Sequence, residues 1–494
     1  MKLKKVIAII LFAMLMLMPL GETALAVSKA KPATSISSYD KNFPERLSDS
    51  NLYAETAILI DGKTGRVLYA KDKDKEMYPA SITKIMTALL TLENCSLGDV
   101  TECTLNSTRS EASWIPVRYK EQYTVEQLLY AMMMKSANDA AIVLAEEVAG
   151  TVDSFAQMMN AKAVRLGCEN TSFVTPNGLP HDNHYTSAHD MARIAMEAMK
   201  NPTFRKIITT TSYTLPKTAL RDTEVPIKNT NAFLFSSGDK NFAYEYGIGI
   251  KTGYTNAAQH SFVGAAEKDG MLLISVVLGT TKEGKWLDTQ KLMDYGFATN
   301  EPLDIISYYE NSPHTVLVMG AVDSETKNGF IPLDIHPEDR DLLKGYFDTK
   351  ENVRNLKTNI KNYITIVSNP NINAPVKAND QLATLTFQAP FMPDPVNVRL
   401  VAISDITMKA VQTMQPTITA GTSEIPAGLN FSTTPTSSNK KKLLGFLLLI
   451  PAAIIVLIVM AIVFSSFSRA KKRKRRQQQR ARKYNSHPPE YRQY

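Results

Sequence analysis

A stretch of 26 residues without a single charge, Leu443–Ser468, lies near the C-terminus, and a densely basic segment follows it directly. About 20 consecutive apolar residues are enough for a helix to cross a bilayer. A basic cluster beside such a stretch is typical of the cytoplasmic side of a membrane. We therefore expect a transmembrane helix at residues 443–468, a basic cytoplasmic tail at 469–494, and a single-pass cell-membrane protein whose bulk lies outside the cytoplasm.

The N-terminus has the pattern of an export signal. Three lysines within the first five residues precede the apolar run 6–20, and small residues around Ala26 suit a cleavage site. The run is shorter than a membrane-spanning helix requires. We expect a cleaved signal peptide at residues 1–26, followed by a polar leader at 27–52.

The tail accounts for the net charge of +8. Residues 469–494 hold eleven basic residues and one acid, which leaves residues 27–442 mildly acidic. A basic block directly beside an apolar span needs no nucleic-acid partner to explain it, so we expect none.

Three cysteines, Cys95, Cys103 and Cys168, are too few for a fold built on disulfides, and their odd number leaves at least one free. A Cys95–Cys103 bridge and buried free thiols both remain open. No Cys and His residues have the spacing of a metal site, and we expect neither a metal nor a cofactor.

The apolar pattern of residues 53–298 predicts one α+β domain. It opens as a hairpin with a turn at Asp61–Gly65, and a long, interrupted helical stretch follows to about residue 199. Strands at both ends with helices between them predict a sheet whose first and last strands are neighbours and which helices cover. The closing strands are expected at about residues 247–251, 261–266 and 271–278.

Residues 302–405 have a different pattern, in which short alternating segments are separated by Pro, Asn and Asp. This pattern is typical of a small all-β domain. Residues 412–439 are rich in Thr, Ser and Pro and suit a flexible stalk. Strands of the small domain are expected near residues 315–319, 363–367, 381–387 and 396–403.

Ser81-Ile82-Thr83-Lys84 is the first candidate for chemistry. Only Ser81 precedes an apolar helical pattern, in which residues three apart share one face. A serine hydroxyl needs a neighbouring base, and a partly buried lysine near other cations can lose its proton near neutral pH. The alternative is a helix-capping serine beside a solvated lysine. The spacing alone has little value because it recurs at Ser28/Lys31, Ser38/Lys41, Ser237/Lys240, Ser324/Lys327 and Ser437/Lys440.

Ser136-Ala137-Asn138 interrupts a long helical pattern. Short polar residues at such a junction often only cap a helix. Lys135, Asn138 and Asp139, however, bring several polar groups into an otherwise apolar surround, which favours a functional site.

Lys-Thr-Gly occurs twice. The copy at Lys63–Gly65 falls in the hairpin turn, where such residues are ordinary turn chemistry. The copy at Lys251-Thr252-Gly253 ends the strand pattern Gly247–Ile250, so its lysine lies on one face of a sheet, and Gly253 lets a substrate backbone come close.

The three motifs in this order form the signature of the serine penicillin-recognising proteins. More narrowly, residues 53–298 resemble the low-molecular-weight D-alanyl-D-alanine carboxypeptidases of peptidase family S11. This resemblance implies a β-lactamase/transpeptidase-like domain, with an antiparallel sheet flanked by helices, followed by the small β domain. The supporting segments are Tyr78–Lys84, Phe173–Leu179, Thr186–Ala192 and Gly249–Thr255.

The resemblance implies a catalytic role for four residues. Ser81 would attack the carbonyl between the two terminal D-alanines of a peptidoglycan stem peptide, and Lys84 would take its proton. Ser136 would relay a proton to the leaving amine, while Asn138 would hold Lys84 and the substrate amide.

The resemblance also implies a substrate-binding role for Lys251, Thr252, Gly253 and Tyr254. The first two would bind the terminal carboxylate, and the backbone N–H groups of Ser81 and Tyr254 would form an oxyanion hole. β-Lactams would mimic the dipeptide and inhibit through a slowly hydrolysed acyl-enzyme. His181 and His184 would lie in a surface loop and His189 at a helix start, without a metal.

Other functions remain open. A β-lactamase of the same fold is disfavoured by Ser136-Ala137-Asn138 in place of Ser-Asp-Asn, by the extra β domain and by the anchor. A non-catalytic β-lactam sensor or wall-binding scaffold is disfavoured because residues 469–494 hold no sizeable effector. Endopeptidase and transpeptidase reactions share the acyl-enzyme and are not distinguished by the sequence.

Overall fold

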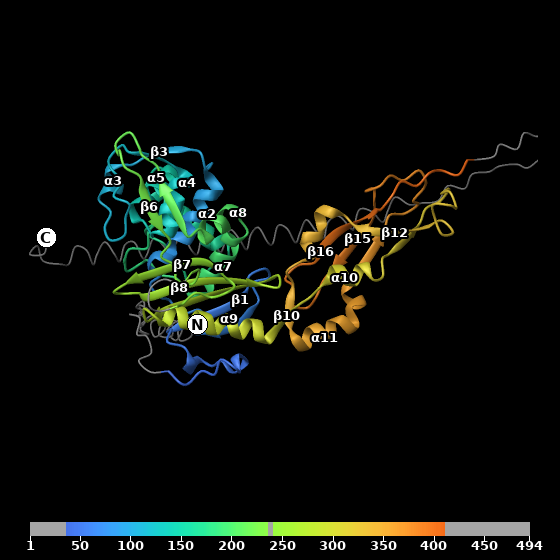
Figure 1. The fold of residues 1–494 in the computed structure, drawn as a ribbon, viewed down its shortest axis with the longest axis horizontal. Coiled ribbons are helices and arrows are strands. Elements are labelled where there is room, and N and C mark those ends of the chain that lie inside the picture. The colour runs from blue at the N-terminus through green and yellow to red at the C-terminus, as the bar shows by residue number, and fades with distance from the viewer. Residues whose placement is uncertain (1–35, 236–240, 411–494) are drawn as a thin grey trace, which may run out of the picture. The chain divides into compact units, whose positions relative to one another are not determined.

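The computed structural model describes residues 36–235 and 241–410 (Figure 1). Residues 56–299, here called the helix-covered part, are built on a five-stranded antiparallel sheet in the order β2-β1-β9-β8-β7. Its strands are β1 (Thr56–Asp61), β2 (Val67–Lys71), β7 (Gly247–Thr255), β8 (Gln259–Lys268) and β9 (Met271–Thr280).

The first strand of this sheet pairs directly with the last one. Thr56 of β1 lies opposite Leu278 of β9, and β1 also forms the expected hairpin with β2. The prediction that the first and last strands of this sheet are neighbours is therefore confirmed.

Both faces of the sheet are buried. Along β9, Ile274 and Val276 pack into the core beneath the helical stretch, whereas Leu273 and Val277 pack with Trp286 on the opposite face. Successive strand residues point to opposite faces, so two apolar covers require an apolar residue at nearly every position.

The helices come from the middle of the sequence and from the segment after β9. In Figure 1, α2, α4, α5, α7 and α8 lie on one side of the sheet and α9 on the other. Their bounds are α2 (Lys84–Asn94), α4 (Val125–Met134), α5 (Asn138–Ala149), α6 (Val152–Arg165), α7 (Ala188–Met199), α8 (Pro202–Thr209) and α9 (Gly284–Thr299). Short elements between them are β3 (Val100–Glu102), α3 (Leu105–Thr108), β4 (Gln122–Thr124), β5 (Ser212–Leu215) and β6 (Val225–Lys228).

Residues 300–410, here called the β-rich part, hold a second five-stranded sheet in the order β11-β12-β16-β15-β14. The expectation of a purely β domain is wrong, because α10 (Ile305–Glu310) and α11 (Lys350–Asn359) also belong to this part. Val353 and Leu356 of α11 are buried, which gives this mostly polar helix its packed face. The strands are β10 (Asn300–Pro302), β11 (Thr315–Leu317), β12 (Phe330–Ile335), β13 (Phe347–Thr349), β14 (Ile364–Ser368), β15 (Gln381–Phe387) and β16 (Val396–Ala402).

Several predicted segments lie outside the described residues, namely those at 1–26, 412–439, 443–468 and 469–494. Within residues 36–235 and 241–410, no helix combines the length and the apolar character that crossing a membrane requires. Cys95, Cys103 and Cys168 are all free thiols, and the last two are buried. Of the two alternatives left by the sequence, the structure therefore has free thiols and no Cys95–Cys103 bridge.

Candidate active site

Ser81 lies in a tight turn that leads into a helix. The turn is a 3₁₀ helix, η3 (Ala80–Thr83), which continues directly into α2, so Ser81 precedes the α-helix rather than lying in its first turn. Ala80 has a φ of 53°, in the left-handed region that residues with a side chain rarely adopt. The predicted shared face is confirmed, because Nζ of Lys84 lies 2.9 Å from Oγ of Ser81.

Lys84 is fully buried, and three oxygen atoms surround its amine. Besides Ser81 Oγ, these are Oδ1 of Asn138 and the backbone oxygen of Asn177, each 2.7 Å from Nζ. Burial and, secondarily, the charge of Lys251 hold the pKa of Lys84 well below 10.5. A neutral amine has two hydrogens and one lone pair. When the Lys84 amine is neutral, the two carbonyl oxygens, which can only accept, take its hydrogens, and its lone pair is left for the Ser81 hydroxyl.

Ser136 and Asn138 lie at the junction of α4 and α5, as predicted. Asn138 is fixed from three sides: Lys84 donates to its Oδ1, its Nδ2 donates to the backbone oxygen of Glu111 at 2.7 Å, and its backbone N–H donates to Ser113. The polar groups at this junction therefore position Lys84 and join the loop around residue 113 to α5.

Strand β7 continues to Thr255, beyond the end that the sequence indicated. Lys251 is 2% exposed, and its Nζ donates to the backbone oxygen of Thr252 at 3.1 Å. Burial and the charge of Lys285 lower the pKa of Lys251 to about 7. Lys251 is thus a buried cation beneath the site.

Gly253 packs closely against η3, the turn that carries Ser81. A Cβ at this position would lie 3.0 Å from the backbone oxygen of Pro79 and 3.2 Å from the backbone N of Ser81. The missing side chain lets β7 lie directly against the turn, which brings the backbone after Gly253 close to the N–H of Ser81.

A cleft of about 510 Å³ opens over Ser81. This volume suits a small molecule or a peptide end. Lys84 and Lys251 lie buried beneath its walls. The other predicted site residues all line it, namely Ser81, Ser136, Asn138, Thr252, Gly253 and Tyr254.

His260 and Lys285 also line this cleft, although the sequence did not single them out. Tyr254 of β7 pairs with His260 of β8, and their rings stack with centroids 4.3 Å apart. Nζ of Lys285 lies 3.5 Å from Nδ1 of His260. The motif at β7 and the pairing of β7 with β8 could have located His260, whereas a single lysine at the start of α9 carries no pattern.

Comparison with known proteins fits this arrangement. The profile of the D-alanyl-D-alanine carboxypeptidase family, peptidase S11, matches residues 44–282. The chain is 31% identical over 362 residues to D-alanyl-D-alanine carboxypeptidase DacF of Bacillus subtilis, covering 71% of this chain and 86% of the relative. The chain belongs to the D-alanyl-D-alanine carboxypeptidase family. It is accordingly a serine enzyme of the carboxypeptidase class.

Two further similar proteins each match about half of this chain. D-alanyl-D-alanine carboxypeptidase DacB2 of Mycobacterium tuberculosis is 36% identical over 253 residues, which is 50% of this chain and 83% of the relative. The solved Streptomyces K15 DD-transpeptidase is 33% identical, with a TM-score of 0.47, and the match covers 51% of this chain and all of that one.

The Asn-Gly-Leu segment, Asn177-Gly178-Leu179, packs against the serine turn, η3 (Ala80–Thr83). Gly178 has a φ of 83°, and a Cβ there would lie 1.9 Å from the backbone oxygen of Ala80. Directly before this contact in the sequence, the backbone oxygen of Asn177 accepts from Lys84, and that of Pro176 accepts from Thr87 Oγ1 at 2.6 Å. The segment therefore requires a glycine where it crosses the turn.

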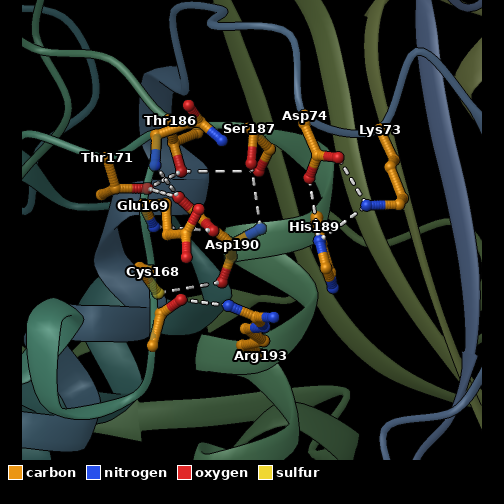
Figure 2. Close-up of polar contacts among 12 residues, drawn as sticks. Lys73, Asp74, Cys168, Glu169, Thr171, Thr186, Ser187, His189, Asp190 and Arg193 are labelled. Atoms are coloured by element: carbon orange, nitrogen blue, oxygen red, sulfur yellow. Dashed lines mark hydrogen bonds and ion pairs between the residues drawn. The ribbon is translucent and has the colours of Figure 1, made fainter.

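The Ala-x-Asp-Met-Ala segment, Ala188–Ala192, fixes residues 168–171, which precede the Asn-Gly-Leu segment in the sequence. Figure 2 shows Asp190, at the start of α7, facing residues 168–171. Its carboxylate accepts from the backbone N–H of Asn170 at 2.7 Å and from Thr171 Oγ1 at 2.8 Å. Ser187 Oγ accepts from the N–H of Asp190 and caps the helix. This family segment thus holds residues 170 and 171 against the start of α7.

The expected surface position of His184 is wrong. Its side chain is buried, with 1% exposed, whereas His189 begins α7 as expected and contacts Asp74 and Lys73 near the surface (Figure 2). Sequence reasoning missed His184 because its loop is polar on both sides. Within the described ranges, no group of three or more His, Cys, Asp or Glu side chains is placed to hold a metal ion.

Proposed function

We propose that this chain removes the terminal D-alanine from peptidoglycan stem peptides through an acyl-enzyme on Ser81. The observation that carries the proposal is the fully buried Lys84 amine, whose Nζ lies 2.9 Å from Ser81 Oγ and 2.7 Å from an oxygen of Asn138 and of Asn177, and whose pKa is lowered by burial. A serine with such a base is an activated nucleophile.

In the first half of the reaction, Ser81 Oγ attacks the carbonyl carbon of the penultimate D-alanine while its proton passes to Nζ of Lys84. The backbone N–H groups of Ser81 and Tyr254 stabilise the resulting oxyanion. The C–N bond to the terminal D-alanine then breaks. The proton moves from Lys84 through Ser136 to the leaving amine, and free D-alanine departs.

In the second half, water attacks the ester on Ser81. Lys84 accepts a proton from the water and returns one to Oγ, so the free serine and a shortened peptide result. Asn138 keeps Lys84 in place throughout, because its Oδ1 remains the acceptor of one Nζ hydrogen.

The terminal carboxylate is expected at Thr252 and Gly253, which line the cleft next to Lys251 in the sequence. Lys251 lies beneath these residues, and Lys285 lines the cleft itself. A carboxylate between two such cations gains charge-assisted contacts, which supports selectivity for a peptide with a free C-terminus.

β-Lactams are proposed to acylate Ser81 by the same attack and to leave it slowly. We also propose that residues 443–468 anchor the chain in the cell membrane, with the cleft outside the cytoplasm, since 26 uncharged residues precede a basic tail.

Two measurements on the full chain in detergent micelles test the proposal. A labelled penicillin should form a stable adduct whose peptide mass maps to Ser81, and a pentapeptide ending in D-Ala-D-Ala should release D-alanine. Ser81→Ala should abolish both. Equal release by the parent and the variant would exclude Ser81, rapid penicillin turnover would favour a β-lactamase, and no release by either would favour a scaffold.

A further inference from the structure

His184 is held rigidly behind the serine turn. The segment around it is bonded on two sides, because Tyr185 exchanges backbone hydrogen bonds with Ser172, and Thr186 exchanges them with Met77. Met77 lies shortly before the turn that carries Ser81. The histidine ring is therefore placed by backbone that belongs to both neighbouring segments.

The hydrogen bonds of the ring fix its tautomer. Nδ1 accepts from the backbone N–H of Val174 at 3.0 Å and of Thr175 at 3.3 Å. Because Nδ1 accepts, the hydrogen of the neutral ring lies on Nε2. Nε2 lies 3.0 Å from Oγ1 of Thr83 and donates to it, and Oγ1 in turn donates to the backbone oxygen of Ala80 at 2.8 Å.

This chain of hydrogen bonds ends on the residue directly before the nucleophile. Ala80 has its unusual φ of 53°, and its carbonyl oxygen is in contact with Gly178. A backbone in this region persists only where its surroundings hold it. The other end of the chain, Val174 and Thr175, leads into Asn177, whose oxygen accepts from Lys84.

We propose that His184 is a positioning residue for the reaction, which locks the turn of Ser81 and the loop that holds Lys84 into one geometry through its bonds to Thr83 and to the backbone at 174–175. This inference rests on the proposed role of Ser81 and Lys84. His184 touches neither the cleft nor the reacting atoms.

The charge state of the ring agrees with this role. Burial, followed by the charges of His181 and Lys84, lowers the pKa of His184 to about 3. The ring therefore stays neutral over the pH range in which the enzyme would work, and its two bonds keep their directions.

Two amide substitutions test the hydrogen bonds of the two ring nitrogens, Nδ1 and Nε2, one at a time. His184→Gln can still place a donor near Thr83 but loses the acceptor for the loop. His184→Asn can keep that acceptor but loses the donor. The matched control is His189→Gln, five residues further on, whose ring contacts only Lys73 and Asp74 among the described polar groups (Figure 2).

The test measures the acylation of the full chain by a labelled penicillin, resolved into noncovalent binding and the chemical step, beside the melting temperature. We expect His184→Asn to slow the chemical step by about 10- to 100-fold, as misplacement of a reacting group does, with noncovalent binding changed by less than about 3-fold. His184→Gln should slow the chemical step less than His184→Asn does, and His189→Gln should match the parent. The acid limb of the pH profile should move upward in His184→Asn, because a loosened loop admits water to Lys84.

Thr83→Val provides a second route if His184→Asn does not fold, since it keeps the shape of Thr83 and removes both of its hydrogen bonds. It should slow the same step. Parent-like acylation in a folded His184→Asn or Thr83→Val chain, with Ser81→Ala inactive, would overturn the inference alone. A melting temperature that falls without any change in the chemical step or the pH profile would also overturn it. Acylation of Ser81→Ala would instead overturn the proposed function.

Discussion

The helix-covered part and the β-rich part differ in whether their basic side chains are buried. Among the described residues, every buried lysine lies in the helix-covered part, namely Lys84, Lys162, Lys251, Lys285 and Lys291. In the β-rich part, Arg399 stays near the surface, with ion pairs to Asp339 at 2.7 Å and to Glu338 at 3.0 Å. Burial of a charged group costs roughly several kcal/mol per ion unless a partner compensates the charge.

The buried lysines themselves fall into two groups. Lys162 has the carboxylate of Glu93 at 2.6 Å, an ordinary compensation. Lys84 and Lys251, by contrast, donate to uncharged oxygens, and the pKa of each is lowered. The comparison teaches that burial against uncharged oxygens lowers the pKa of a lysine, which at Lys84 favours the uncharged amine that a base requires.

Lys84→Met should have the largest effect on activity. Without the base, the rate of penicillin acylation should fall by roughly 10²- to 10⁴-fold, while the free energy of unfolding is kept or increased because a desolvated amine is removed. Stopped-flow acylation and urea denaturation measure the two quantities.

Lys162→Met is the matched control for this first prediction. It removes a buried lysine that is paired with Glu93, so acylation should stay at the parent rate and stability should fall by about 1 kcal/mol or less. Equal losses of activity in both variants would break the distinction between the two groups of lysines.

Gly178→Ala should have the largest effect on stability. Its Cβ would overlap the backbone oxygen of Ala80, at a φ of 83°, so we expect a loss of more than ~3 kcal/mol together with slow acylation. Gly320→Ala in the β-rich part has a similar φ of 72° but open space around the new Cβ, so it should cost about 1 kcal/mol and leave acylation intact. Similar losses in the two variants would show that backbone conformation, and not the contact with the serine turn, decides the cost.

Lys251 should make stability depend on pH above neutrality. Its pKa is about 7 in the folded chain and near 10.5 when exposed, so between these values the unfolded chain binds more protons, and stability rises with pH. In Lys251→Met, the rise in the free energy of unfolding from pH 7 to 10 should be smaller than in the parent. Urea denaturation across this range would give parallel curves if Lys251 were protonated throughout.

Arg399→Met should have the smallest effect, confined to the β-rich part. The guanidinium of Arg399 holds the pKa of Asp339 at about 2, so its contribution is present above the unfolded value near 3.8 and disappears as the pH falls to about 2. We expect unchanged acylation and a slightly lower midpoint of denaturation at pH 6. A difference of the same size at pH 2 would argue against the ion pair as its source.

The sheet of the helix-covered part could be predicted because both of its faces are covered, which makes most residues of β1 and β9 apolar. The β-rich part was predicted less well. Pro332 lies within β12 and is a residue that usually argues against a strand. Helix α11 is mostly polar, with only Val353 and Leu356 buried, and therefore has little apolar periodicity.

The residues of the candidate site also differ in how well the sequence predicts them. Ser81, Asn138 and Lys251 belong to short motifs with fixed spacing, so the sequence reveals them. His184 and Lys285 have no such spacing. They gain their surroundings from other segments of the chain, namely Thr83 and Val174 for His184 and His260 for Lys285. Contacts of this kind require the fold.

The pairing of β1 with β9 also has a consequence for how the chain matures. β1 is made early, yet its partner strand follows more than 200 residues later, so the central sheet closes only after the whole helical stretch has been synthesised. Loop closure over such a separation slows folding. Because Ser81 and Lys251 lie near the two ends of the stretch that this pairing encloses, a labelled penicillin that reacts at Ser81 would count only the molecules in which the sheet is complete. Pulse-labelling with penicillin would then follow maturation in time.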